Sequence, residues 1–130
     1  MNSLIPYINE YDLLTPEEKA YVTNGCGPKF GLLGSIAPDF CGTYTSACNL
    51  HDWIYWSGGP VAIKDLADIK FKDDMRVINS GLSWWKRFTL SWVPDFYYSI
   101  VRWLGNPMYS RTPYRRTRQD LQREMRNASV

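Results

Sequence analysis

The chain has 130 residues, of which 45% are hydrophobic, and a formal net charge of +2 at pH 7. This length predicts one domain with a modest core, and so small a charge argues against nucleic acid as the main partner. One histidine and three cysteines do not make a convincing four-ligand zinc site.

The first six residues lack the basic start and the long apolar run of an ordinary signal peptide. Three explanations stay open. The chain is exported by another route, it is a mature or excised domain, or its cysteines stay reduced.

The first strong helix signal begins at Thr15, a good N-cap, with Pro16 at the first helical position and Glu18 completing a capping box. Gly25 is predicted to end this helix. Residues 23–31 then form a glycine-rich turn with many free backbone groups. Such a loop is either a plain connector or a source of carbonyls for a cation and of amides for an oxyanion.

The next predicted helix carries Cys48, His51 and Tyr55, which share one face, while Asp52 lies about a quarter turn away. This arrangement places a candidate base, His51, and a candidate metal ligand, Asp52, on different sides of the helix. His51 can take a proton from water at neutral pH, and Asp52 is a hard oxygen donor suited to calcium. The alternative is that His51 is a packed, hydrogen-bonded core residue.

A second long helix is predicted from residue 61 to residue 78. Its apolar stripe consists of Ala62, Leu66, Ile69, Met75 and Ile78. Asp74 is expected at the edge of this buried face, where a carboxylate needs a partner, and the available donors are His51 and Tyr55. The alternative is that residues 70–76 form a solvated charge pattern.

The order of these patterns resembles the secreted phospholipase A2 superfamily. A Cys-Gly loop is followed by Cys-x-x-His-Asp-x-x-Tyr and then by Phe-x-x-Asp-Met on a second helix. The resemblance is greatest to divergent bacterial and fungal members, and it covers residues 23–77. It implies a mainly α-helical fold in which two antiparallel central helices carry the active site and a calcium loop precedes the first.

The resemblance also implies catalytic roles. It makes His51 the base, Asp74 the aspartate that orients the base, and Tyr55 the tyrosine that steadies that aspartate. The implied nucleophile is a water activated by His51.

Calcium is the cofactor that the resemblance implies. Its expected ligands are the Asp52 carboxylate and the backbone carbonyls of Gly25, Gly27 and Lys29. The side-chain oxygen of Asn24 is an alternative ligand, and the Gly27 amide is expected to help form the oxyanion hole.

The resemblance pairs Cys26 with Cys48, a disulfide that would join the calcium loop to the active-site helix. Cys41 is then left over. It is free, it pairs between chains, or it is the true partner of one of the other two cysteines. The oligomeric state stays open.

Residues 82–104 are crowded with aromatic side chains. These are Trp84, Trp85, Phe88, Trp92, Phe96, Tyr97, Tyr98 and Trp103. Interspersed charges exclude a simple membrane span, and Pro94 is predicted to divide the stretch into two short helices. Aromatic rings with Lys and Arg are typical of a membrane-interface surface. We expect about half of the rings to complete the core and the remainder to be exposed.

We expect a phospholipase A2-like catalytic domain at residues 1–105 and a basic C-terminal segment at residues 106–130, in which residues 111–126 carry six arginines. Such a segment attracts anionic lipid or nucleic acid by charge. The alternative is a solvated helix or a disordered end.

The predicted function is calcium-dependent hydrolysis of the sn-2 ester of a glycerophospholipid to lysophospholipid and fatty acid, by a secreted or membrane-associated enzyme that acts at a phospholipid membrane surface. Intact His51, Asp52 and Asp74 favour an enzyme. One alternative is a non-catalytic, phospholipase-like protein that binds or perturbs membranes. Another is an interaction domain that uses the aromatic and arginine-rich half to bind a protein.

Overall fold

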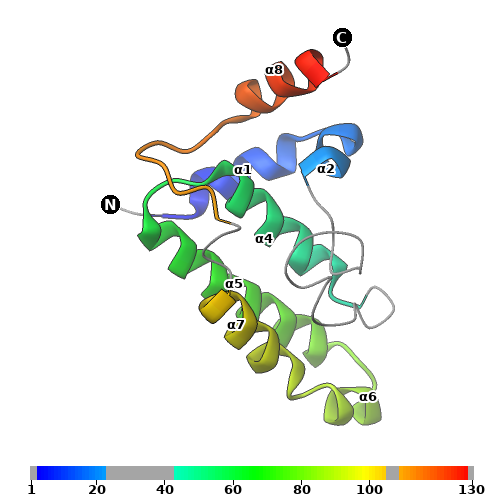
Figure 1. Cartoon of the computed structure of the whole chain (residues 1–130). Helices are drawn as coiled ribbons and strands as arrows, with labels where there is room; N and C mark the ends of the chain where they lie inside the picture. Colours follow the sequence, from blue (N-terminus) through cyan, green and yellow to red (C-terminus); the bar gives the residue numbers. More distant parts are fainter. Residues whose placement is uncertain (1–2, 23–42, 105–108, 129–130) are drawn as a thin grey trace.

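The computed structural model describes residues 3–22, 43–104 and 109–128, and their regular structure is helical (Figure 1). The helices are α1 (Ile5–Leu13), α2 (Pro16–Val22), α4 (Thr45–Ser57), α5 (Val61–Ser80), α6 (Trp84–Thr89), α7 (Val93–Leu104) and α8 (Arg118–Ala128). Within these ranges the only β-type pairing is an isolated bridge between Gly59 and Arg111. The predicted mainly α-helical fold is confirmed.

The capping box predicted at the start of α2 is present. The Thr15 N–H donates to Glu18 Oε1 at 2.8 Å, and the Glu18 N–H donates to Thr15 Oγ1 at 3.1 Å. Two N–H groups near the helix start are thereby satisfied by side chains. The helix end predicted at Gly25 lies outside the described residues.

Helices α4 and α5 form the predicted antiparallel pair at the centre of the molecule (Figure 1). Residues 58–60 connect the last residue of α4, Ser57, to the first residue of α5, Val61. At the far end of the pair, the hydroxyl of Tyr44 donates to Asn79 Oδ1 at 2.5 Å. The other side of α5 packs against α7.

The buried face of α5 differs from the predicted stripe. Its buried residues are Ile63, Lys64, Ala67, Asp68, Phe71, Met75 and Asn79. Of the predicted stripe only Met75 is buried, whereas Ile69 is exposed. The reason is that α5 packs between α4 and α7, so its inner face includes two charged residues, Lys64 and Asp68, that satisfy each other.

In the described part of the chain, the core consists of two apolar clusters that meet along α4. One joins α4 and α5 to α7 and contains Tyr44, Ala47, Cys48, Phe71, Met75, Val93, Tyr97, Ile100 and Val101. The other joins α4 and α5 to α1, α2 and α8 and contains Tyr7, Leu14, Val22, Trp53, Ile54, Tyr55, Ile63, Ala67, Tyr109 and Leu121. His51 lies on α4 between Cys48 of the first cluster and Tyr55 of the second.

The turn between α4 and α5 depends on two glycines. Gly58 has φ 71° and Gly59 has φ 127°, backbone conformations that L side chains rarely adopt. The Gly59 N–H donates to the Ser110 carbonyl at 3.2 Å, and the Ser110 N–H donates to the Tyr55 carbonyl at 3.1 Å. A Cβ at Gly58 would lie 1.9 Å from the Ser110 carbonyl oxygen, so the close approach of these two segments requires glycine.

The described part of the basic C-terminal segment is tied to the helical body. Arg115 pairs with Glu10 at 2.8 Å, Arg118 pairs with Glu18 at 3.0 Å, and the side chain of Leu121 is completely buried. In its described part, this segment therefore forms a helix at Arg118–Ala128 that is held to the helical body by these contacts. The boundary predicted between residues 105 and 106 lies outside the described residues.

The aromatic stretch is divided into two helices, α6 and α7, as predicted, but the break falls at residues 90–92 and Pro94 is the second residue of α7. Fewer rings enter the core than expected, because Tyr97 is buried and Tyr98 is half-buried while the other six are exposed. Within the described residues, no helix combines the length and the apolar character that a membrane span requires.

The glycine turn yields a stability prediction. Gly58→Ala should lower the free energy of unfolding by at least about 2 kcal/mol, because the new methyl group meets a backbone oxygen and the residue is held at positive φ. Gly81→Ala is the matched control, since a Cβ there has its nearest neighbour at 3.6 Å. Urea unfolding followed by circular dichroism measures both. Equal effects of the two substitutions would contradict this account of the turn.

Candidate active site

His51 is held by rings on both sides. Its imidazole stacks on Phe71 of α5 with centroids 4.6 Å apart and an interplanar angle of 28°, and it contacts the ring of Tyr55 at 4.1 Å. The side chain is buried. Because Tyr55 lies one helical turn after His51, the predicted shared face of α4 is confirmed.

The partner of His51 is Asp68. Asp68 Oδ1 accepts hydrogen bonds from His51 Nε2 at 2.8 Å and from the hydroxyl of Tyr55 at 2.6 Å. Asp68 is completely buried on α5. These contacts join the two central helices through one carboxylate oxygen.

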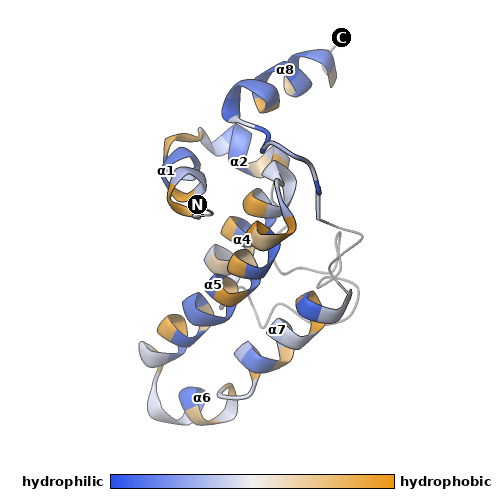
Figure 2. Cartoon of the chain, turned by 90° about the vertical axis from the view of Figure 1, so that its left-hand side faces the viewer, coloured by the Kyte–Doolittle hydropathy of each residue, from blue (hydrophilic) through white to orange (hydrophobic). Residues whose placement is uncertain are grey.

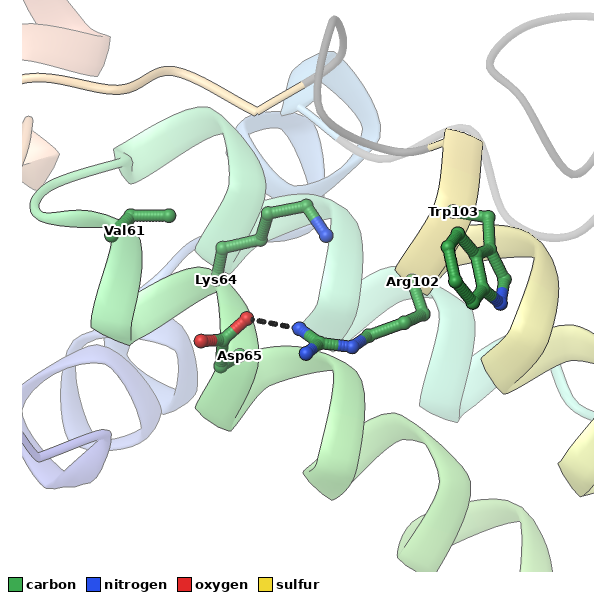
Figure 3. A pocket seen from close by; sticks show the side chains of 5 residues that line it. All are labelled: Val61, Lys64, Asp65, Arg102 and Trp103. Carbon is green, nitrogen blue, oxygen red and sulfur yellow. Dashed lines mark hydrogen bonds and ion pairs between the residues drawn. The ribbon is translucent and has the colours of Figure 1, made fainter.

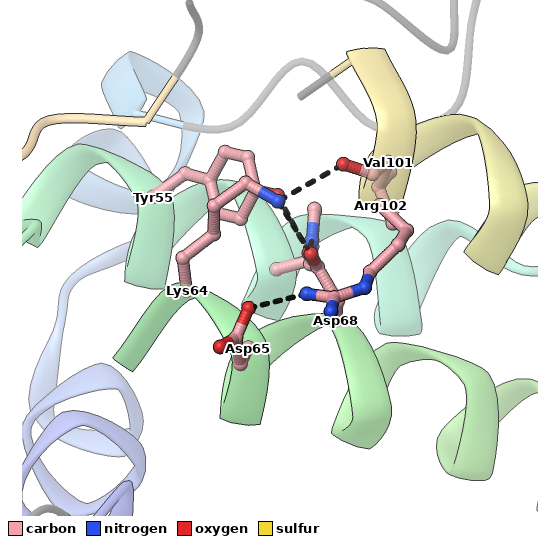
Figure 4. Close-up of polar contacts among 7 residues, drawn as sticks. Tyr55, Lys64, Asp65, Asp68, Val101 and Arg102 are labelled. Atoms are coloured by element: carbon pink, nitrogen blue, oxygen red, sulfur yellow. Dashed lines mark hydrogen bonds and ion pairs between the residues drawn. The ribbon is translucent and has the colours of Figure 1, made fainter. Parts of the chain in front are cut away.

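The second oxygen of Asp68 binds a buried lysine. The ammonium of Lys64 lies 2.8 Å from Asp68 Oδ2 and donates to the carbonyl of Val101 at 3.1 Å (Figure 4). Val101 is in the last turn of α7, where carbonyls lack partners within the helix. Lys64 therefore neutralises the buried carboxylate and at the same time supplies a cation to the C-terminal end of α7.

The network keeps Asp68 ionised. Burial opposes ionisation, but hydrogen bonds from the imidazole, the ammonium and the phenol outweigh it and hold the pKa of Asp68 below its ordinary value. Burial, followed by the nearby Asp68 charge, raises the pKa of Tyr55. Tyr55 therefore stays a protonated donor.

The hydrogen bond to Asp68 assigns the tautomer of His51. An ionised carboxylate only accepts, so Nε2 carries the proton and Nδ1 carries the lone pair of the neutral ring. Nδ1 is thus the nitrogen that can accept a proton from water. A carboxylate that orients an imidazole and stabilises its charged form is the usual arrangement for a histidine general base.

The predicted contact of Asp74 with His51 and Tyr55 is wrong. Asp74 is half-buried and pairs with Lys70 on its own helix at 3.0 Å. Asp74 lies six residues beyond Asp68, which is about 9 Å further along the helix and about 120° around it. The orienting position is therefore occupied by Asp68.

Sequence reasoning assigned Lys64 and Asp68 no role, although one signal was available. Lys64, Asp68, Phe71 and Met75 follow a spacing of four, three and four residues, which places them on one face of a helix. Lys64 and Asp68 carry opposite charges and lie four residues apart on the face that carries Phe71 and Met75. This pattern indicates an ion pair that can be buried.

Asp52 lies beside His51 on α4 and is half-buried. Burial, followed by the charges of Asp12 and Asp52, raises the pKa of Tyr11 on α1. The charge of Asp52 on α4 therefore acts on Tyr11 of α1.

The other predicted calcium ligands, Gly25, Gly27 and Lys29, lie outside the described residues, as do the alternative ligand Asn24 and the oxyanion amide of Gly27. Across the three described ranges, no group of three or more His, Cys, Asp or Glu side chains could hold a metal ion. The predicted calcium site stays a prediction.

Cys48 is buried on α4, while Cys26 and Cys41 lie outside the described residues. The predicted disulfide pairing stays a prediction as well.

A pocket of about 460 Å³ opens beside the lysine end of the network (Figure 3). It is lined by Val61, Lys64, Asp65, Arg102 and Trp103. Arg102 and Asp65 pair at 2.6 Å, so the two charges at its surface neutralise each other. A second hollow, of about 300 Å³, lies among α1, α4 and α5 and includes Leu50 and Asp74.

Comparison of the chain with protein-family models, with curated proteins and with solved structures finds no match.

The buried ion pair yields a prediction about coupling. Lys64→Met should lower the free energy of unfolding by about 3 to 5 kcal/mol, because the Asp68 charge stays buried without its cation. Combining Lys64→Met with Asp68→Asn should cost less than the sum of the two single substitutions. Urea unfolding of the three variants measures the coupling.

Lys70→Met is the matched control, because it breaks the half-buried pair with Asp74 and should cost about 1 kcal/mol or less. If the Lys64 and Asp68 effects simply add, the two side chains do not depend on each other and the network is misassigned.

Proposed function

We propose that this protein is a hydrolase of phospholipid esters in which His51 is the general base. The observation that carries the proposal is the hydrogen bond between His51 Nε2 and the buried Asp68 carboxylate. This bond leaves Nδ1 as the nitrogen with the lone pair, and we propose that Nδ1 accepts the proton of the attacking water.

The proposed step transfers one proton from water to His51 Nδ1 while the water oxygen attacks the ester carbonyl. The ionised Asp68 carboxylate stabilises the imidazolium that forms. His51 then returns the proton to the departing alkoxide, the bond between the carbonyl carbon and that oxygen breaks, and the products are a carboxylic acid and an alcohol. The base is thereby regenerated without a covalent intermediate.

Tyr55 and Lys64 have positioning roles in this proposal. Tyr55 shares Asp68 Oδ1 with the imidazole, and Lys64 holds Oδ2. Together they fix both oxygens of the carboxylate, so its orientation does not depend on the histidine alone.

The substrate class rests on the resemblance to secreted phospholipases A2, which implies the sn-2 ester of a glycerophospholipid as substrate and a lysophospholipid and a fatty acid as products. The exposed aromatic rings of α6 and α7 support a lipid substrate, because such rings settle at the depth of lipid headgroups.

Asp52 suits the calcium ion that the resemblance to secreted phospholipases A2 implies. It is a carboxylate, the kind of hard oxygen donor that calcium prefers, and it is the residue next to the proposed base. Calcium, when bound, would polarise the ester carbonyl. The remaining proposed ligands are the carbonyls of Gly25, Gly27 and Lys29.

The exposed rings also fit a second candidate function, a phospholipase-like protein that binds or perturbs membranes without turnover. The two candidates differ in one measurable respect. Only the hydrolase requires His51 and Asp68 for fatty-acid release from phosphatidylcholine vesicles.

Three substitutions test the assignment of the base and its partner. His51→Gln should lower fatty-acid release by about 100- to 10,000-fold, the usual contribution of a general base. Asp68→Asn should lower release by less, because it removes the charge that orients and stabilises the imidazole but not the proton acceptor. Asp74→Asn is the matched control and should leave release unchanged.

Circular dichroism and vesicle binding show whether each variant is folded before it is assayed. A full loss of activity in Asp74→Asn together with an active Asp68→Asn would overturn the assignment. Substantial release by His51→Gln would remove the proposed mechanism altogether.

Removal of calcium tests the metal. Chelation with EGTA should abolish fatty-acid release and excess calcium should restore it, while magnesium should substitute poorly because it demands a tighter octahedral geometry. Asp52→Asn should lose the response to calcium. Asp12→Asn is the matched control, because the Asp12 charge also acts on Tyr11 but is not a proposed ligand. Full turnover in EGTA would show that the reaction does not use calcium.

A further inference from the structure

Helix α6 buries none of its residues, although half of them are large aromatic side chains. Trp84 is 75% exposed, Phe88 is 77% exposed, and Trp85 is 54% exposed. A ring of this kind contributes strongly to a core when it is buried. A helix that leaves three such rings in solvent presents a surface suited to a partner.

The three rings occupy one side of α6. At about 100° per residue, Trp84, Trp85 and Phe88 fall within an arc of about 100°, and Lys86 and Arg87 follow on the remaining circumference. The ammonium of Lys86 lies 5.6 Å from the centre of the Trp85 ring. The helix therefore combines an apolar side with flanking cations.

Two more exposed rings follow α6 in the chain, Trp92 just before α7 and Phe96 in its first turn. Trp92 and Phe96 are 51% and 41% exposed, and their rings contact each other edge to face at 5.4 Å. We call the five side chains Trp84, Trp85, Phe88, Trp92 and Phe96 the aromatic tip. In Figures 1 and 2, which differ by a quarter turn, α6 lies at the end of the molecule opposite α8.

The charge around the aromatic tip is positive. Residues 79–94 contain Lys86 and Arg87 and no Asp or Glu. The next acidic residue, Asp95, pairs with Arg76 at 2.8 Å. A partner of this tip should therefore be negatively charged.

We propose that the aromatic tip docks this protein onto the surface of an anionic phospholipid bilayer. The rings enter at headgroup depth and the two cations contact lipid phosphates. Two observations favour a bilayer. The cations Lys86 and Arg87 match its negative charge, and α6 lies at one end of the molecule, where its rings can meet an extended surface. The proposal rests on the proposed function only for the choice of phospholipid.

Two arginines of the C-terminal segment, Arg115 and Arg116, are bound within the protein. Arg115 pairs with Glu10, Arg116 donates to the Trp56 carbonyl at 2.9 Å, and the Arg116 guanidinium lies 4.1 Å from the centre of the Trp56 ring. These charges hold the segment to the helical body instead of facing a membrane.

The test is binding to vesicles of equal parts phosphatidylcholine and phosphatidylglycerol, both as ether-linked lipids without ester bonds, in the presence of EGTA. Hydrolysis cannot occur, so a failure of the proposed enzyme function does not affect the result. Trp84→Ala combined with Phe88→Ala should lower the partition coefficient at least about tenfold, because two rings lose their burial in the lipid. Sedimentation of sucrose-loaded vesicles measures it.

The charge is tested separately. Lys86→Ser combined with Arg87→Ser should weaken binding to the anionic vesicles about tenfold or more and should have little effect on phosphatidylcholine alone. Because all four substituted side chains are exposed, the thermal midpoints of both double variants should stay within a few degrees of the parent chain.

Two control variants replace the same types of residue, exposed tryptophan and exposed arginine, outside the aromatic tip. Trp103→Ala removes a ring that is 79% exposed at the other end of α7, and Arg111→Ser combined with Arg123→Ser removes two exposed cations of the C-terminal segment. Both should bind like the parent chain.

Unchanged binding by the Trp84 and Phe88 double variant would overturn the proposal, and so would an equal loss in the controls. Analytical ultracentrifugation tests whether the aromatic tip instead joins two copies of the chain. If the parent chain dimerises without binding vesicles and the double variant is a monomer, the tip is an interface between two copies and the proposal is wrong.

Discussion

The structure depends on how one buried negative charge is satisfied. Asp68 has no exposed surface, and an unpaired carboxylate in such a position is very costly. His51, Tyr55 and Lys64 supply three donors to its two oxygens. The two donors from α4 fix how that helix is rotated against α5, and Lys64 carries the network on to the end of α7. The same contacts hold His51 in the orientation that its proposed role as a base requires.

The surrounding elements hold this network in place. The turn at Gly58 and Gly59 lets the chain around Ser110 pass directly beside α4 and α5, and the arginines that follow bind α1 and α2 through Glu10 and Glu18. The C-terminal segment thus closes over the side of α4 that carries Tyr55. The aromatic tip, by contrast, contributes little to the core, which is consistent with a role outside the folded body.

Local signals predicted most of the helical structure. The capping box at Thr15 and Glu18, the helix beginning at Val61 and the break between two helices near Pro94 each depend on neighbouring residues, so they can be recognised without knowing the tertiary contacts. The shared face of His51 and Tyr55 followed from helical spacing in the same way.

The partner of His51 could not be predicted as reliably, because it depends on which face of α5 is buried. Charged residues on a helix usually face solvent, and the apolar stripe together with the resemblance to secreted phospholipases A2 indicates Asp74, not Asp68. Only the packing of α5 between α4 and α7 shows that a lysine and an aspartate can be buried together. The exposure of the six aromatic rings could not be predicted for a similar reason. The amino-acid sequence of such a stretch is the same whether its rings are buried or exposed.

NMR of the imidazole shows whether Asp68 holds His51 by its Nε2 hydrogen. His51 is the only histidine, so its ring signals need no assignment among several residues. We expect a protonated Nε2 whose hydrogen exchanges slowly with water at neutral pH in the parent chain and in Asp74→Asn, and loses its protection in Asp68→Asn. A proton on Nδ1 instead, or an Nε2 hydrogen that is lost in Asp74→Asn and kept in Asp68→Asn, would contradict this expectation.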